Sequence, residues 1–443
     1  MLSARSQEAN GFPLVIIIAD GWTRELFHEA LHDALLPEIQ GELLEPGILF
    51  PTVISVFPSV SIASHTTLLT GLNQCDHGIP GHRWLFRDKG SSRDYIGPHV
   101  RAVNADIYRN VQTVFERHHP RSSFAVQSIV NRGATGVIDL LTMNSEKILA
   151  RTAELARTHP DSVIVSWLPK GDVLSHIYGP RSKALIAEMR STSRGVRRLT
   201  ESLRRSGLLS RARILFTSDH GQKPVAKRFV LTEFFRRLGY SSLQNRAAGV
   251  GADVSVFSSG DSSTYIYFDG RHFTKEARFH ILADLAKREG IGLIFCRADA
   301  RSHFILANQG IAKLSLASPT EIEYGVVTGD DPLDLLNGGR AARFTGDVLD
   351  DSVQQQRYPD LLHQYLDSYV PARSADVLVT SAPTYHFGMA PRLAWRFGYH
   401  RGSHGGPSRE EMLFSAIGFG STATIDNSPL RSKDLLRRFE SAP

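Results

Sequence analysis

PLVIIIAD, residues 13–20, is a run of aliphatic residues that ends on a carboxylate. A continuous apolar run bounded by a proline and a charged residue is typical of a strand buried on both faces of a parallel sheet. Ligands of such sheets collect outside the carboxyl ends of the strands. Asp20 is therefore placed where a functional side chain is expected.

Similar short apolar runs recur along the chain, at 123–128, 162–168, 212–218, 375–381 and 411–418. Stretches with helical spacing, 145–159 and 183–207, lie between several of them. Strands that alternate with helices indicate an α/β fold, with a mostly parallel sheet between helix layers.

The stretch 226–370 differs from the rest of the chain in its pattern of expected elements. Strand-like segments at 264–268 and 293–297 lie on either side of an expected helix at 274–289. We interpret it as an inserted α+β cap lobe that selects the substrate. The catalytic α/β core is then expected to comprise residues 10–225 together with 371–430.

The composition is that of an ordinary globular protein, with 42% hydrophobic and 22% charged residues in a chain of 443. No apolar run reaches the length of a membrane span, so no membrane partner is expected. Only two cysteines occur, and residues 1–22 lack a signal-peptide cleavage site, which favours a cytoplasmic protein.

The net charge of +6 is compatible with an anionic substrate. Its basic residues fall in helix-like stretches such as 190–206 and 431–440, where solvated helix faces are the simpler interpretation. No nucleic-acid motif accompanies the charge, so nucleic acid is not the expected partner. The sequence leaves the oligomeric state open.

Carboxylates and imidazoles gather in three further short contexts. Asp172 and His176, four residues apart, reach the same side of one helical turn. Asp219 and His220 follow the run at 212–218, and His404 lies in GSHGG. Such a mixture suits borderline divalent ions, Zn²⁺ first, with Mn²⁺, Co²⁺ or Fe²⁺ as alternatives.

Charge arithmetic favours two metal ions over one. Two divalent cations bring +4, and Asp20, Asp172 and Asp219 bring −3, which leaves a formal charge of +1. That balance suits a phosphodiester anion. Two ions about 4 Å apart also hold the attacking oxygen and a nonbridging oxygen in line.

PSVSIASHTTLLTG, residues 58–71, is expected to be a loop that enters a helix, with Ser61 at or next to the N-cap and Gly71 as the stop. A serine beside a divalent cation becomes a competent nucleophile. The alternative is an ordinary helix cap worth about 1 kcal/mol. Ser59 and Ser64 are neighbouring candidates.

These segments, in this order, resemble the alkaline phosphatase superfamily, most closely its type I phosphodiesterase/nucleotide pyrophosphatase branch. The most specific pieces are the stretches 172–180, 218–221, 402–405 and 68–79. The resemblance implies an alkaline-phosphatase-like core and a metal-dependent hydrolase of phosphodiester or nucleotide pyrophosphate bonds. The implied partner is a small anionic phosphoester, with nucleotides among the candidates.

The resemblance also implies a role for each residue. Asp172, His176 and His404 would hold one metal ion, and Asp20, Asp219, His220 and the nucleophile would hold the other. Ser61 stands where the family carries its threonine or serine nucleophile, which implies a phosphoseryl intermediate.

The chain departs from the family at this motif. Family members often carry Thr-Phe-Pro-Asn-His, where residues 61–65 are Ser-Ile-Ala-Ser-His. Ser64, a shorter donor, would take over the contact of the asparagine amide with the substrate. Arg83 and Trp84 are candidates for a cation and a stacking face toward the substrate, and packing in the core is the alternative for Trp84.

Two alternative functions stay open at this stage. A phosphonate hydrolase or phosphomonoesterase could use the same two-metal core. A catalytically inactive protein that binds a phosphate ligand or nucleic acid belongs to another class, although clustered carboxylates without metal would be costly.

Overall fold

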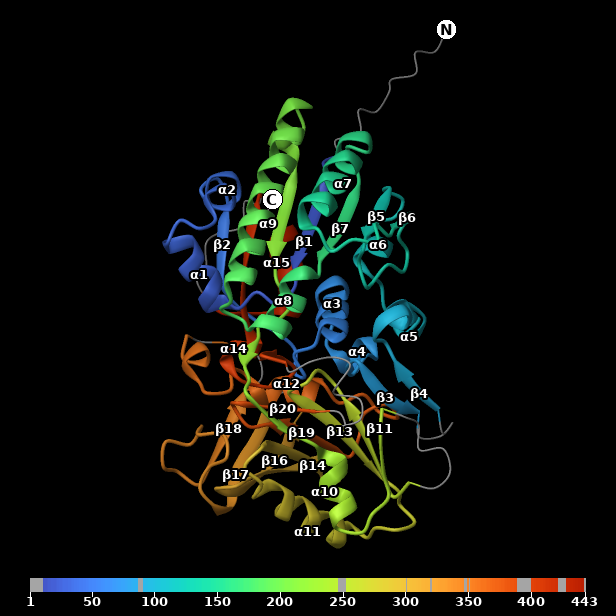
Figure 1. Cartoon of the computed structure of the whole chain (residues 1–443), viewed down its shortest axis with the longest axis vertical. Coiled ribbons are helices and arrows are strands. Elements are labelled where there is room, and N and C mark those ends of the chain that lie inside the picture. The colour runs from blue at the N-terminus through green and yellow to red at the C-terminus, as the bar shows by residue number, and fades with distance from the viewer. Residues whose placement is uncertain are drawn as a thin grey trace.

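A computed structural model describes most of the chain, namely residues 11–86, 91–245, 252–299, 301–318, 321–345, 349, 351–388, 400–420 and 428–441. Its strands form two large sheets with their helices, which lie one above the other in Figure 1, and three sheets of two strands each. The α/β class expected from the sequence is confirmed. Within these residues, no helix combines the length and apolar character that crossing a bilayer requires. The cytoplasmic location stays a prediction.

The first sheet has eight strands, in the order β23 (Leu430–Arg431), β2 (Ile48–Ile54), β22 (Leu413–Phe419), β8 (Arg213–Thr217), β1 (Leu14–Ala19), β7 (Val163–Leu168), β5 (Ser123–Val126) and β6 (Gly136–Ile138). β1 pairs in parallel with both β7 and β8, and β22 is antiparallel to its two neighbours. The sheet is thus mostly parallel, as predicted. The carboxyl ends of β1, β7 and β8 meet at one edge.

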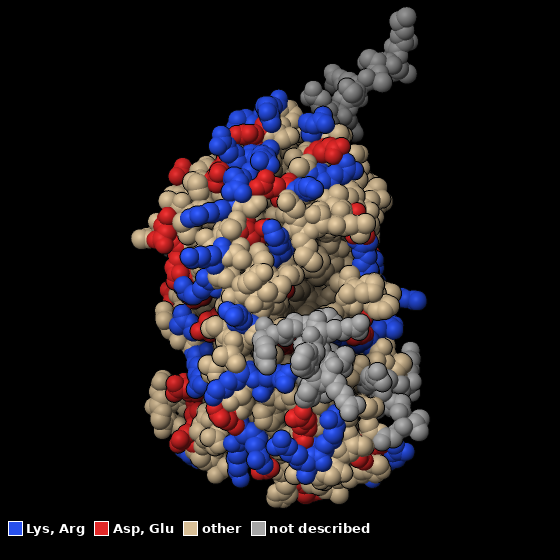
Figure 2. All heavy atoms as spheres, viewed as in Figure 1, with Lys and Arg blue, Asp and Glu red and all other residues tan. Residues whose placement is uncertain are grey.

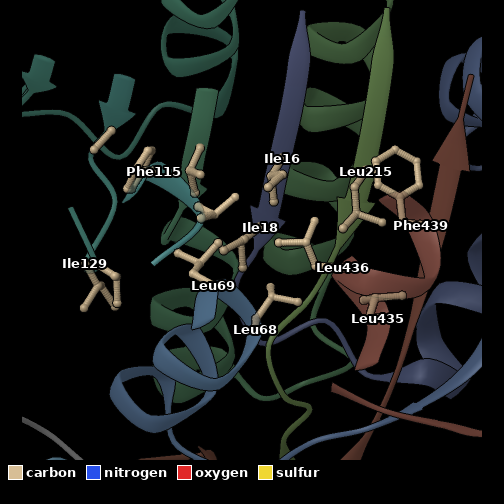
Figure 3. Packing of buried hydrophobic residues seen from close by; sticks show 14 of the residues in the cluster. Ile16, Ile18, Leu68, Leu69, Phe115, Ile129, Leu215, Leu435, Leu436 and Phe439 are labelled. Carbon is tan, nitrogen blue, oxygen red and sulfur yellow. The ribbon is translucent and has the colours of Figure 1, made fainter. Parts of the chain in front are cut away.

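Alternation along β1 explains why helices cover both faces of this sheet. Leu14, Ile16 and Ile18 pack with α3 (Ser61–Thr70) and α15 (Ser432–Glu440), as Figure 3 shows for the labelled side chains. The intervening Val15 and Ile17 pack with α1 (Arg24–His32), α7 (Ser145–Thr158) and α9 (Lys183–Arg205). Period-two burial on both faces leaves no polar position in the strand before Asp20.

The second sheet has nine strands, in the order β11 (Ser242–Gln244), β12 (Val254–Ser258), β13 (Ser263–Phe268), β19 (Val377–Ser381), β14 (Ile291–Arg297), β15 (Ser302–Ala307), β16 (Gly310–Ser318), β17 (Glu321–Gly329) and β18 (Ala341–Thr345). α10 (Leu231–Arg237) and α11 (Lys275–Ala286) pack on one face. The other face packs against Phe57, Met412 and Leu413, which belong to the part of the molecule that contains the first sheet.

One strand lies in a different sheet from the one expected. The run at 375–381 was expected to belong to the core, and β19 is instead antiparallel to β13 and β14 in the second sheet. Its burial was predicted correctly, but an apolar run does not specify which strands it pairs with. The division into a core of 10–225 with 371–430 and a lobe of 226–370 stays a prediction. Residues 421–427 lie outside the described ones.

A buried ion pair joins the two parts of the molecule. Asp360, before α12 (Leu361–Asp367), accepts hydrogen bonds from Arg431 at 2.7 and 2.9 Å, at the start of α15. Burial acts to raise the pKa of Asp360, but hydrogen bonds from Arg431 and His363 outweigh it and lower the pKa from 3.8 to about 2. The ionised carboxylate therefore stabilises the folded state above pH 4.

We predict that Asp360→Asn lowers the free energy of unfolding by about 2 kcal/mol or more at pH 7, because the buried Arg431 loses the negative charge of the carboxylate that it contacts. The difference from wild type should shrink as the pH falls from about 4 to about 2, where the wild-type carboxylate is itself protonated. Denaturant unfolding at pH 7 and pH 3 measures both effects. Asp434→Asn removes an exposed pair on the same helix and should change stability by less than about 0.5 kcal/mol; an equal loss in both variants would contradict the prediction.

Candidate active site

The six side chains predicted as metal ligands converge beyond the carboxyl ends of the central strands: Asp20 after β1, Asp172 and His176 on α8 (Lys170–Tyr178) after β7, Asp219 and His220 after β8, and His404 after β21 (Gly402–Ser403). They form two groups. Within each group, the candidate ligand atoms lie within 4.8 Å of one another.

The three imidazoles share one hydrogen-bonding pattern, in which Nδ1 faces a backbone carbonyl: His176 to Gly402 at 2.9 Å, His220 to Gly221 at 3.0 Å and His404 to Ser59 at 2.9 Å. A carbonyl oxygen only accepts, so Nδ1 carries the proton in each ring. Nε2 is then left with a lone pair. This is the arrangement that orients a histidine toward a metal ion.

The first group places these lone pairs against carboxylates. Nε2 of His220 lies 3.5 Å from Oδ1 of Asp20 and 3.4 Å from Oδ2 of Asp219. Oδ1 of Asp20 is buried without a hydrogen bond, and Oδ2 of Asp219 is buried with Nε2 of His65 at 3.3 Å. Acceptors that face acceptors repel unless a cation lies between them, and these spacings approach the roughly 3.3 Å that separates ligands around a tetrahedral ion with bonds of about 2.0 Å. The residues fit a divalent cation.

The second group has the same form. Oδ1 of Asp172 lies 3.5 Å from Nε2 of His176 and 3.6 Å from Nε2 of His404. The rings of His220 and His404 stack with 3.9 Å between their centroids and 11° between their planes. This stack places the two groups side by side in one site.

Electrostatics in the site also favour bound cations. Burial, followed by the nearby Asp219 and Asp172, raises the pKa of Asp20 well above its usual value. Like charges held together out of water are destabilising unless positive charge offsets them. Burial and the neighbouring His220 lower the pKa of His404 to about 3, which keeps this ring in the neutral form that binds metal.

Ser61 is the first residue of α3, and it does not cap the helix. The N-cap is Val60, which makes no side-chain cap. The Ser61 hydroxyl lies 3.1 Å from Nε2 of His220 and lines the cavity in front of the two ligand groups. Gly71 ends the helix in the left-handed conformation, as expected. The cap interpretation of Ser61 is therefore wrong, and its hydroxyl faces the site.

The two neighbouring serines have other partners. Ser59 donates to the carbonyl of Gly406 at 2.8 Å, and the hydroxyl of Ser64 lies 3.1 Å from that of Ser55. Both serines are buried, and neither is among the residues that line the cavity. Ser64 thus does not present its hydroxyl where the family's asparagine would meet a substrate.

The cavity in front of Ser61 has a volume of about 840 Å³. Arg83 lines it and pairs with Asp94 at 2.9 Å. Trp84 is fully buried, donates to Tyr95 and does not line the cavity, so packing is its role in the fold. His82, which the sequence analysis did not single out, lines the cavity, and no protein group in the described ranges hydrogen-bonds its ring.

Gln222 is a second residue that the sequence analysis missed. Its amide donates to Oδ1 of Asp172 in a short hydrogen bond and to the backbone oxygen of Asp172 at 3.2 Å. These two bonds fix the carboxylate in the direction of His176 and His404. The one signal in the sequence that could have pointed to Gln222 is its position on the same loop, two residues after His220.

The second sheet also contributes to the site through the turn between β12 and β13. The amide of Ser262 donates to the carbonyl of His404 at 3.0 Å, and its hydroxyl lies 2.8 Å from that of Ser403. Gly260, at φ +70°, lies so close that a Cβ atom would be 2.5 Å from the carbonyl of His404. This turn therefore holds the loop that carries His404.

Comparison with known proteins agrees with this geometry. A family model described as type I phosphodiesterase/nucleotide pyrophosphatase matches residues 14–406. The chain belongs to this family. One curated relative, an uncharacterized pyrophosphatase/phosphodiesterase of Schizosaccharomyces pombe, is 22% identical over 231 residues, which cover 48% of this chain and 45% of the relative.

Solved structures of two other proteins share the fold of this chain. Murine ectonucleotide pyrophosphatase/phosphodiesterase 5 is 14% identical with a TM-score of 0.60, over 96% of this chain and 93% of that one. The human protein of that name is 13% identical with a TM-score of 0.60, over 96% and 92%. An inactive form of the murine protein, solved in complex with AMP, is 13% identical with the same TM-score, over 98% and 96%.

We predict that Gln222→Ala weakens the binding of one divalent ion by about 10- to 100-fold, because Asp172 loses the donors that orient it. Competition with a chromophoric chelator measures the affinity for each ion. Gln309→Ala, which removes an exposed amide from a β-turn, is the control and should bind as wild type. Equal affinities in Gln222→Ala and Gln309→Ala would show that Asp172 is positioned without this amide.

Proposed function

We propose that the protein is a metal-dependent hydrolase that cleaves phosphodiester or nucleotide pyrophosphate bonds through a phosphoseryl intermediate on Ser61. The observation that carries the proposal is the Ser61 hydroxyl, which lies 3.1 Å from His220, between the two ligand groups and an open cavity. A hydroxyl in this place has access both to the metal ligands and to a substrate.

In this proposal, two divalent ions occupy the site, Zn²⁺ first, with Mn²⁺, Co²⁺ or Fe²⁺ as alternatives. Asp172, His176 and His404 would hold one ion, and Asp20, Asp219, His220 and Ser61 the other. Bound cations would supply positive charge that favours the serine alkoxide and the phosphoryl oxygens. The lone pairs on Nε2 and the Asp20 oxygen without a hydrogen bond support this assignment.

The remaining steps of the reaction are assigned to residues of the chain. Oγ of Ser61 forms a bond to phosphorus as the bond to the leaving oxygen breaks, and water then hydrolyses the phosphoserine. The first amides of α3 favour an anion at its N-terminus. Because Ser64 is turned away, we assign to His82 the role of the donor that hydrogen-bonds a nonbridging oxygen. The neutral ring of His82 carries one N–H. Arg83 would contact the substrate from the cavity wall.

The test of the function is hydrolysis of bis-p-nitrophenyl phosphate by the purified protein. We expect turnover that is lost on chelation and restored by Zn²⁺, and that exceeds turnover of p-nitrophenyl phosphate and of a phosphonate. A higher rate on the monoester or the phosphonate would assign the site to those reactions instead. Two tightly bound ions without turnover of any of these esters would indicate an inactive binding protein.

We predict that Ser61→Ala lowers kcat by several orders of magnitude and leaves the metal content near two ions per chain, since six other ligands remain. Elemental analysis and steady-state kinetics give the two quantities. Ser61→Thr keeps a hydroxyl nucleophile and should retain activity within about tenfold. Unchanged turnover in Ser61→Ala would remove Ser61 from the role of nucleophile.

A further inference from the structure

The part of the cavity away from the metal ligands is lined mostly by apolar side chains. We call it the apolar wall, and its main members are Ile96, Val100, Ile129, Leu141, Met143 and Val173. The charged residues beside it are paired with one another, Arg101 with Asp139 and Arg83 with Asp94. Among the residues that the structure describes, little unpaired charge is thus left beside this wall to attract a second ionic group of the substrate.

Three members of the wall are large hydrophobic side chains that reach into solvent. Leu141 is 97% exposed, Met143 51% and Ile96 43%. We call these three residues the lip. Exposed apolar groups that gather beside a cavity typically mark a place where a ligand or partner covers them. In Figure 2 the molecule is hollowed between its upper and lower parts, and the described surface along the upper rim of the hollow is mostly neither basic nor acidic.

The backbone holds one residue of the lip in an unfavourable conformation. Leu141 has φ +50°, in the left-handed region, which costs a residue with a Cβ atom roughly 1–2 kcal/mol. Gln127, itself at φ +55°, fixes this segment, because its side-chain amide donates to the carbonyl of Thr142 at 2.7 Å. Strained residues of this kind cluster at ligand-binding sites. The strain presents a leucine to water, where it contributes nothing to the core.

We propose that the apolar wall and the lip bind an aliphatic substituent of the substrate, so that the preferred substrates are small amphiphilic phosphodiesters. This inference rests on the proposed function, since it assumes that the phosphorus lies at Ser61 in the same cavity. A flat base is less well served there, because Trp167 lines the cavity on the side of the metal ligands, where it donates to Asp20 at 2.7 Å. Tyr95 lines this part of the cavity, but it is fully buried with its hydroxyl bound to Asp106 at 3.0 Å, so it offers no face for stacking.

The experiment compares two esters with the same leaving group, p-nitrophenyl methyl phosphate and p-nitrophenyl hexyl phosphate, below the micellar concentration of the latter. Each buried methylene is worth about 0.8 kcal/mol, or about fourfold in affinity. Because part of the chain stays in water, we expect kcat/KM to be at least about tenfold higher for the hexyl ester. Thymidine 5′-p-nitrophenyl phosphate is the comparison with a nucleoside.

Variants of the lip test where the chain binds. Leu141→Gly suits the positive φ and removes the side chain, so the variant should fold at least as stably as wild type. Combined with Met143→Gln, it should lower kcat/KM for the hexyl ester about fivefold or more and leave the methyl ester unchanged. Val137→Gln is the matched control, because Val137 is 46% exposed but does not line the cavity.

The possible outcomes separate this inference from the proposed function. Equal kcat/KM for the methyl and hexyl esters, or a nucleoside ester that is preferred and that loses rate in the lip variant, would overturn the aliphatic assignment and leave the phosphodiesterase intact. If no ester is hydrolysed, the proposed function fails. Calorimetry with hexylphosphonate and methylphosphonate then tests the inference by itself. Tighter binding of the hexyl compound, lost in the lip variant, supports the inference. Equal binding of the two compounds overturns it.

Discussion

The rest of the structure depends on the packing of three imidazole lone pairs against three carboxylates, in a site where Asp20, Asp219, His220 and His404 are buried and Asp172 and His176 border the cavity. Each imidazole is committed to this direction because its other nitrogen donates to a backbone carbonyl. The folded chain without cations therefore holds unfavourable contacts between acceptors. The sheets and helices supply the stability that keeps these groups together, and the cations of the proposed function would turn these contacts into stabilising ones.

The sequence predicts this site well where the information is local. Asp20 and Asp219 follow apolar runs directly, so recognising a buried strand is enough to place them at its carboxyl end. Asp172 and His176 share a face of α8 by their spacing alone. The two ligand sets implied by the resemblance are also the two groups that lie together in space, although their metal content stays a proposal.

Other features depend on contacts between distant segments and could not be predicted in this way. The run at 375–381 is buried as expected, but its sheet is chosen by β13, more than 100 residues earlier in the chain, and by β14, more than 80 residues earlier. Trp84 looks available for stacking in the sequence, but Tyr95 and Arg373 enclose it. His82 carries no recognisable spacing, and Gln222 is marked only by its place two residues after His220, because a cavity wall and a single amide donor follow no periodic pattern.

The close fit between Gly260 and the carbonyl of His404 limits how this architecture can diversify. A side chain at that position would displace the ligand loop, so the turn between β12 and β13 has little freedom to vary while the site is kept. The strands β16 to β18 lie at the other end of the sheet from this turn, and the constraint on them is the apolar packing of side chains such as Leu314 and Tyr324. In chimaeras that graft the second lobe of one family member onto the core of another, the turn should be inherited with the core, and the outer strands can then be exchanged as a module.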